Sequence, residues 1–163
     1  MVVAGSGTAT KARGVPRITA RLSPIGPAEC AKLANAFAYY LDRNMGKELA
    51  ALFTEDGEFK RPGLVVKGHA EFLAWTEKRL SDPETRHLAS SPVFISGDEH
   101  AAKSVSYFTA YRARKTGASL PEYDGPVGIA EYHDDYRKTE EGWRIARRKV
   151  FLVMTPPAKP GAD

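Results

Sequence analysis

Two residues of complementary chemistry, Asp42 and His87, stand out because the segments around them are apolar. Asp42 lies near the end of a predicted helix, beside the apolar face of Phe37 and Leu41, which places its carboxylate close to a core rather than in water. Burial there is expected to raise the pKa of the carboxyl group and to favour its use as a base. His87 begins a strand-like run in which small residues such as Ala89 share its face and leave room for a ligand.

Each of the two residues also has an interpretation that involves no chemistry. Asp42 can be a helix C-terminal residue bonded to solvent or to Arg43, and His87 can be a satisfied histidine at the start of a strand. Their spacing in the sequence does not decide between the two interpretations. Acid–base chemistry requires that the two side chains meet in space.

The common signatures of cofactor chemistry are absent from the sequence. It holds no phosphate-binding glycine loop, no paired Cys-x-x-C, no His-Glu-x-x-His and no Gly-x-Ser-x-Gly. The histidines are scattered, and only His133 with Asp135 has a metal-like spacing, which is too common to define a site. We therefore expect neither a metal nor a nucleotide cofactor.

Polar and aromatic side chains on the strand-like segments supply further candidates for ligand contact. Alternation along a strand places Tyr132 and Asp134 on one face, and a tyrosine hydroxyl can donate to a developing enolate oxygen. Half-buried strand aromatics and a solvated or interface arginine are the structural alternatives. An aromatic wall suits a planar or hydrophobic ligand. The substrate-binding candidates are Tyr107, Tyr132, Asp134 and Arg147.

Helical spacing and turn residues predict the elements that position these groups. Helices are expected over 27–44, 48–53 and 68–80, the second closed by a turn at Asp56-Gly57. Strands are expected over 58–61, 64–67, 86–96, 101–114, 127–138 and 143–154. With helices first and an antiparallel meander second, the pattern predicts an α+β fold with a long curved sheet around about three N-terminal helices.

The length of 163 residues favours one domain between two tails. Residues 1–25 read as a flexible basic arm, 26–154 as the folded domain and 155–163 as a C-terminal tail. Four basic residues near the N-terminus account for the net charge of +4, so the folded body is neutral and nucleic-acid binding is disfavoured: Lys11, Arg13, Arg17 and Arg21.

The cysteine count and the hydropathy pattern bear on the compartment. A single cysteine, Cys30, excludes an intramolecular disulfide framework and fits a reducing, cytoplasmic location. No run of about eighteen apolar residues is present, so no membrane span is expected.

A series of short segments, taken in order, resembles the SnoaL-like family of the nuclear transport factor 2-like superfamily, which includes scytalone dehydratase, dehydrochlorinase and ketosteroid isomerase relatives. The segments are Phe37-Ala-Tyr-Tyr-Leu-Asp42, Leu49-Ala-Ala-Leu-Phe-Thr-Glu-Asp-Gly57, Lys67-Gly-His69, Thr85-Arg-His87, Ser96-Gly-Asp98, Tyr132-His-Asp134 and Gly142-Trp-Arg-Ile145. The resemblance covers residues 27–154 and implies a cone-shaped α+β barrel with a pocket at its mouth.

The resemblance also implies a site. Dehydratase-like members pair an aspartate on the first helix with a histidine at the start of the strand after the third helix, and Asp42 and His87 fall on those positions. In such enzymes the histidine removes a proton next to an activating group without a cofactor. The chain departs from scytalone dehydratase at Leu41, Phe108 and Ala130, which makes scytalone itself an unexpected substrate.

The resulting prediction is a cofactor-independent lyase or isomerase that acts on a small hydrophobic or aromatic molecule. The alternative is a non-catalytic small-ligand-binding or assembly domain of the same fold, since fold does not fix function. The resemblance further implies a homo-oligomer, either a dimer or a trimer.

Overall fold

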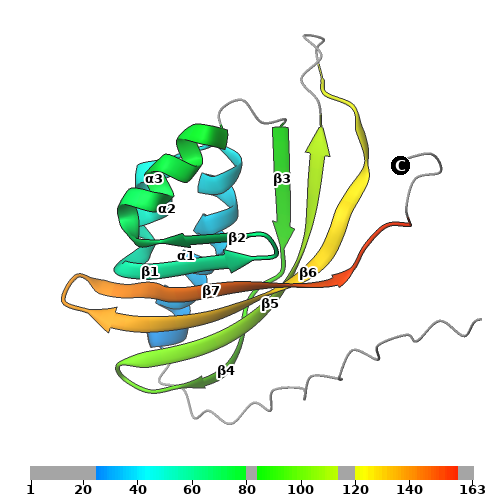
Figure 1. The fold of residues 1–163 in the computed structure, drawn as a ribbon. Coiled ribbons are helices and arrows are strands. Elements are labelled where there is room, and N and C mark those ends of the chain that lie inside the picture. Colours follow the sequence, from blue (N-terminus) through cyan, green and yellow to red (C-terminus); the bar gives the residue numbers. More distant parts are fainter. Residues whose placement is uncertain (1–24, 80–83, 114–119, 158–163) are drawn as a thin grey trace, which may run out of the picture.

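The computed structural model describes residues 25–79, 84–113 and 120–157, and it shows helices packed in the concave side of one curved sheet (Figure 1). The elements are α1 (Ile25–Asp42), α2 (Gly46–Ala51), β1 (Phe53–Arg61), β2 (Leu64–Lys67), α3 (Gly68–Arg79), β3 (Glu84–Ala89), β4 (Val93–Gly97), β5 (Ala101–Ala113), β6 (Tyr123–Thr139) and β7 (Gly142–Met154). The expected α+β class is confirmed.

The seven strands form one open sheet in the order β2-β1-β7-β6-β5-β3, and β4 pairs with β5 beside β3. Neighbouring strands are antiparallel except for β1 and β7, which run parallel. The sheet is therefore mixed and unclosed, in contrast to the purely antiparallel sheet predicted from the sequence. The long strands β5, β6 and β7 bend around the helices (Figure 1).

Helix α1 owes its position to one apolar stripe. Cys30, Ala34, Phe37 and Leu41 recur at spacings of four and three residues, and all four are buried against the sheet. Asn44, with a φ of 53°, takes the left-handed conformation that commonly ends a helix. Asp42 is thus fixed at the C-terminal end of a buried helix.

The approach of α2 to α3 depends on a glycine. A Cβ atom on Gly46 would lie 2.2 Å from Oγ1 of Thr76 on α3, closer than any contact between these atoms allows. Thr76 itself is buried and donates to the carbonyl oxygens of Phe72 and Leu73. Helices α2 and α3 therefore pack closely against each other.

Strand β1 begins earlier than the sequence predicts. The sequence predicts that a short helix ends at Phe53 and that Asp56-Gly57 forms a turn, but β1 runs through both, with a register shift between Phe53 and Glu58. A Cβ on Gly57 would lie 2.8 Å from the Cβ of Phe53, so the irregular part of the strand brings Gly57 too close to Phe53 for any larger residue. The glycine marks a bulge rather than the end of an element.

The segment expected as one strand over 86–96 is divided into β3 and β4. Ser90 donates its backbone N–H to the Tyr107 carbonyl, and its Oγ accepts the Tyr107 N–H at 3.0 Å. Pro92 has no N–H to continue the ladder. A serine side chain therefore replaces a backbone partner at the point where the chain leaves the edge of β5.

The predicted tails fall mostly on residues that the structure does not describe. The arm over 1–25 lies outside the described residues except for Ile25, where α1 begins, and residues 158–163 of the C-terminal tail lie outside them as well. Within the described ranges, no helix is long and apolar enough to cross a membrane.

Candidate active site

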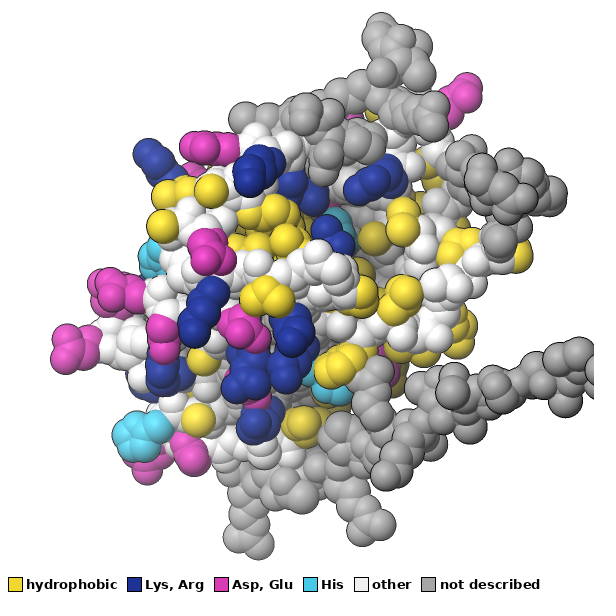
Figure 2. Space-filling model, in the orientation of Figure 1, with side chains coloured by type: hydrophobic (Ala, Val, Ile, Leu, Met, Phe, Trp, Pro, Cys, Tyr) yellow, Lys and Arg dark blue, Asp and Glu magenta, His cyan; other side chains and the backbone are white. Residues whose placement is uncertain are grey.

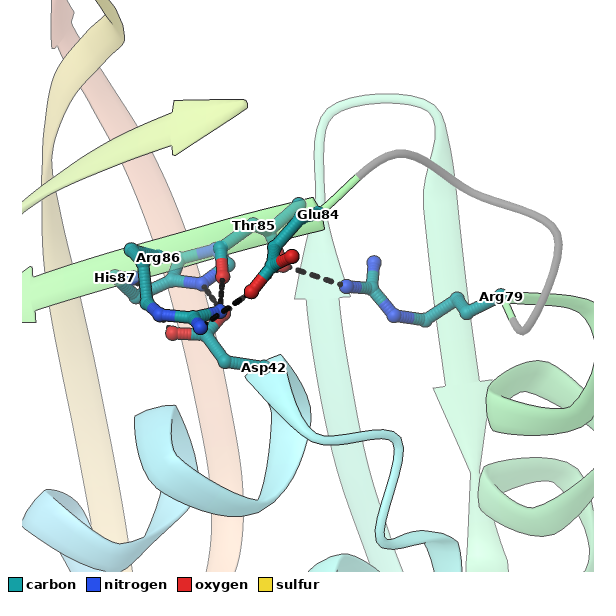
Figure 3. A network of polar contacts seen from close by, with 6 residues as sticks. All are labelled: Asp42, Arg79, Glu84, Thr85, Arg86 and His87. Atoms are coloured by element: carbon teal, nitrogen blue, oxygen red, sulfur yellow. Dashed lines mark hydrogen bonds and ion pairs between the residues drawn. The ribbon is translucent and has the colours of Figure 1, made fainter. Parts of the chain in front are cut away.

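Asp42 lies at the last residue of α1 and points toward β3 (Figure 3). Its side chain is only 5% exposed, and its carboxylate accepts three hydrogen bonds from β3. Oδ1 accepts from Nδ1 of His87 at 2.6 Å and from Oγ1 of Thr85 at 3.0 Å, while Oδ2 accepts from the His87 backbone N–H at 2.8 Å. The helix end is thereby fixed to the strand by one side chain.

These hydrogen bonds reverse the expected shift of the Asp42 pKa. Burial raises the pKa of the carboxyl group, but the bonds and the charge interaction from His87, together with the Thr85 hydroxyl, outweigh burial and hold that pKa below its usual value. The sequence-based expectation of a raised pKa was therefore wrong. Asp42 is a permanent carboxylate near neutral pH, suited to orient a partner rather than to take up a proton itself.

The contact with Asp42 fixes the tautomer of His87. A carboxylate can only accept, so Nδ1 of the ring carries the hydrogen and Nε2 of the neutral ring is left with a lone pair. His87 is 14% exposed at its side chain, and its ring lines a cavity. No hydrogen bond to Nε2 is found among the described residues. The pair has the geometry of a carboxylate-oriented general base.

A second layer of contacts holds the pair in place. Arg79, the last residue of α3, donates to Oγ1 of Thr85 at 3.3 Å, and Thr85 in turn donates to Asp42 (Figure 3). The Arg79 guanidinium also lies 5.5 Å from the Trp75 ring. Three elements, α1, α3 and β3, therefore meet at the carboxylate.

The cavity beside His87 has a volume of about 280 Å³, just below the usual range for small-molecule pockets. Its wall is largely apolar and aromatic, and includes two stacked pairs. Phe108 lies over Tyr132 with ring centroids 3.9 Å apart, and Phe59 lies over Trp75 at 5.2 Å. Its apolar lining residues include Leu41, Phe59, Trp75, Phe108, Val150 and Leu152.

Tyr132, one of the four predicted ligand contacts, lines this cavity. Burial raises the pKa of its hydroxyl well above the usual value for tyrosine, so the group is protonated near neutral pH. A protonated phenol can donate to an oxygen that gains negative charge. Its ring lies between Phe108 and the guanidinium of Arg148, which is 4.2 Å from the Tyr132 centroid.

The other three predicted ligand contacts lie away from the cavity. Tyr107 is 63% exposed on the outer face of β5, and Arg147 pairs with Asp135 at 3.6 Å on the outer face of β7. Asp134 is buried and accepts from Nε and Nη2 of Arg148 at 2.7 and 2.6 Å. None of the three lines the cavity around His87.

A bulge in β7 explains why Arg148, rather than Arg147, faces inward. Tyr136 pairs with Ile145 but Asp135 pairs with Arg147, so Ala146 is an extra residue. One extra residue moves every later side chain to the opposite face of a strand. Simple alternation from Ile145 therefore places Arg147 on the inner face, where the structure has Arg148, and no signal in the sequence marks the bulge.

Sequence reasoning also missed Arg79 and the hydroxyl of Thr85 as supports of the pair. Thr85 could have been found, because it stands two residues before His87 and shares its strand face. Arg79 comes from a different element, and only packing brings it near. Among the described residues no group of three or more His, Cys, Asp or Glu side chains could hold a metal ion.

With this geometry established, comparison with known proteins decides the family. The family model for a SnoaL-like domain matches residues 27–149. The chain belongs to the SnoaL-like family. A search of curated proteins gave no match.

Solved structures that resemble this SnoaL-like protein have the same fold. An NTF2-like protein with a cystatin-like fold from Novosphingobium aromaticivorans is 20% identical, with a TM-score of 0.67 over 84% of this chain and 86% of that one. A candidate scytalone dehydratase from the same organism is 25% identical, with a TM-score of 0.63 over 78% and 84%. ActVI-ORFA from Streptomyces coelicolor is 22% identical, with a TM-score of 0.62 over 77% and 95%.

Proposed function

We propose that this SnoaL-like protein is a cofactor-independent lyase or isomerase in which His87 removes a proton from a carbon acid. The observation that carries the proposal is the 2.6 Å contact between Nδ1 of His87 and Oδ1 of Asp42 beside a cavity. The similarity to a candidate scytalone dehydratase adds support, because dehydration requires the same kind of base.

The proposed step starts with a carbon next to a carbonyl group in the cavity. Nε2 of His87 takes the proton, the C–H electron pair becomes the enolate, and Asp42 stabilises the imidazolium that forms. The Tyr132 hydroxyl, which stays protonated, donates to the enolate oxygen. In an isomerisation, the electron pair of a conjugated enolate forms a C–H bond at another carbon with the proton that the imidazolium returns. In a dehydration, that electron pair forms a C=C bond while the C–O bond to a hydroxyl on the adjacent carbon breaks, and the imidazolium gives its proton to the departing oxygen to form water.

The non-catalytic alternative predicts a different arrangement. A binding or assembly domain has no need of a histidine whose tautomer a buried carboxylate fixes, nor of a cavity at that ring. Both features are present here, and they favour a catalytic role over binding alone. The alternative would gain support if a ligand bound in the cavity without any reaction that depends on His87.

Hydrogen exchange into a neutral aromatic ketone tests the proton-removal step without knowledge of the natural substrate. We would incubate 1-tetralone with the protein in D2O and follow loss of the proton signal next to the carbonyl by NMR. Wild type should accelerate the exchange, and His87→Gln should lower that acceleration about 10²- to 10⁴-fold, the usual contribution of a general base. His133→Gln, which alters a histidine on the outer face paired with Glu131, is the matched control. Equal exchange by wild type and His87→Gln would remove His87 from the role of base.

The oligomer and the cytoplasmic location remain predictions. Exposed apolar side chains on the outer face of the sheet could form an oligomer interface, and Val93 and Tyr107 are each more than half exposed there. Light scattering measured during size-exclusion chromatography gives the molar mass and therefore the number of subunits.

A further inference from the structure

The charged side chains around the cavity are all cationic. Arg61, at the end of β1, Arg79, at the end of α3, and Arg112, near the end of β5, contribute to its wall, and among the described residues no aspartate or glutamate does so. In Figure 2, several Lys and Arg side chains border a recessed group of hydrophobic side chains in the upper half of the view. The cavity therefore combines an apolar interior with a positive rim.

Among the described residues, two of these arginines lack the carboxylate partner that five other arginines have. Arg86, Arg137, Arg144, Arg147 and Arg148 each form an ion pair with a carboxylate. Within the described ranges the side chain of Arg61 has a hydrogen bond only to the Pro62 carbonyl oxygen, and the side chain of Arg112 has no ion pair or hydrogen bond. No carboxylate of the described residues is therefore paired with either positive charge at the rim, and such charges raise the local concentration of anions.

Sheet register places Arg112 on the inner face. Arg112 pairs with Thr85 and Ala110 pairs with His87, and directly opposed residues of an antiparallel ladder share a face. Because Thr85 and His87 both bind the buried carboxylate of Asp42, Arg112 extends from the same side of the sheet as the site. Arg112 is therefore placed by the same two strands that position the base.

We propose that the molecule bound beside His87 is an aromatic or similarly planar carboxylate, whose acidic group is held by Arg61 and Arg112. This inference rests on the proposed function, since it names the substrate class of the same site. A guanidinium matches a carboxylate with two parallel hydrogen bonds, and this match distinguishes an acid from its neutral amide. The stacked pairs Phe59–Trp75 and Phe108–Tyr132 provide flat walls for the ring system.

The test compares a charged ligand with its neutral isostere. Calorimetric titration at pH 7 would measure binding of 2-naphthoate and of 2-naphthamide, which differ in charge but little in shape. Wild type should bind naphthoate at least tenfold more tightly, and this preference should weaken as salt is added. Arg61→Gln and Arg112→Gln should each reduce the preference several-fold, and the double variant should remove it.

Matched variants separate this inference from other effects. Arg137→Gln removes an arginine outside the cavity wall that is paired with Asp56, and the preference for naphthoate should persist in it. Arg112→Lys keeps the charge but loses the two-pronged geometry, so it should retain part of the preference. Both rim arginines are exposed, so their substitution should leave the fold intact, which circular dichroism verifies.

The inference is overturned if wild type binds the amide as tightly as the acid, if neither ligand binds at millimolar concentration, or if the preference survives in the double variant. Its failure differs from failure of the proposed function. If ketone exchange is unaffected by His87→Gln but the preference for naphthoate depends on the arginines, the protein binds acids and His87 is not the base. If His87→Gln abolishes the exchange but wild type shows no preference for naphthoate, the role of His87 as base stands and the carboxylate substrate class is wrong.

Discussion

Replacement of Asp42 by asparagine tests most directly how the site is held together. The side chain keeps its shape but exchanges one acceptor oxygen for an NH2 donor, whereas the structure offers it three donors and no acceptor. If the remaining oxygen faces Nδ1 of His87 and the Thr85 hydroxyl, the amide NH2 faces the His87 backbone N–H. If the amide is flipped, its NH2 faces Nδ1 and favours the tautomer with hydrogen on Nε2.

Both orientations therefore have a predictable cost. The first replaces a charge-assisted hydrogen bond to a buried N–H by a donor–donor contact, which costs about 1.5–3 kcal/mol of folding free energy. The second removes the lone pair from Nε2 and with it the base. We expect Asp42→Asn to lower the unfolding free energy at pH 7 by about 2 kcal/mol and to slow exchange into 1-tetralone about 10²-fold or more.

The stability loss should depend on pH in a defined direction. The folded-state pKa of Asp42 lies below its ordinary value of 3.8, so the carboxylate contributes stability that is fully present above that value. This contribution is lost as the pH falls through the folded-state pKa. The difference in unfolding free energy between wild type and Asp42→Asn should therefore be largest near neutral pH and shrink in acid.

Urea unfolding at several pH values and exchange measured by NMR on the same preparations provide the assay. Asp98→Asn is the matched control, because Asp98 also accepts two backbone hydrogen bonds, from His100 and Ala101, but lies in a turn away from the cavity. A folded Asp42→Asn protein whose exchange rate stays within twofold of wild type would refute the argument that Asp42 sets the tautomer of His87.

Three further predictions concern groups around the site and in the core. Thr85→Val removes one donor to Asp42 but leaves both His87 contacts, so exchange into 1-tetralone should fall about tenfold or less, and a loss as large as that of Asp42→Asn would contradict the assigned supporting role. Arg148→Met leaves Asp134 buried without its ion-pair partner and should cost about 3–5 kcal/mol in urea unfolding, with an unchanged midpoint as the contrary result. Burial raises the pKa of the Cys30 thiol to about 12, so its reaction with a disulfide reagent should require unfolding, and a fast reaction of the native protein would show that the helix opens locally.

Much of the fold follows from local patterns in the sequence. The apolar stripe of α1 requires one buried face, and the β-branched and aromatic runs after residue 100 require long strands. Asn44 and Gly46 end and start helices for reasons of backbone conformation and close approach. Such elements are predictable because the physical cause lies within a few residues of the effect.

The errors arose where the cause lay in a neighbouring strand. Strand β3 ends before Ser90, whose side chain accepts a hydrogen bond from the Tyr107 backbone N–H of β5. Ala146 is an extra residue of β7 because the register with β6 shifts at that position. The parallel pairing of β1 with β7 joins residues about ninety positions apart along the chain. None of these partners is recognisable from the residue alone.

The candidate site shows the same division. Residue types and their resemblance to a known family were enough to select Asp42 and His87, because a carboxylate at a helix end and a histidine at a strand start are visible in the sequence. Tertiary structure decided that His87 donates to Asp42, that burial of the carboxylate is outweighed by its hydrogen bonds, and that arginines from three elements border one cavity. The reason is physical: a residue's chemistry is its own, but its protonation, orientation and charge environment depend on atoms that only folding brings within a few ångströms.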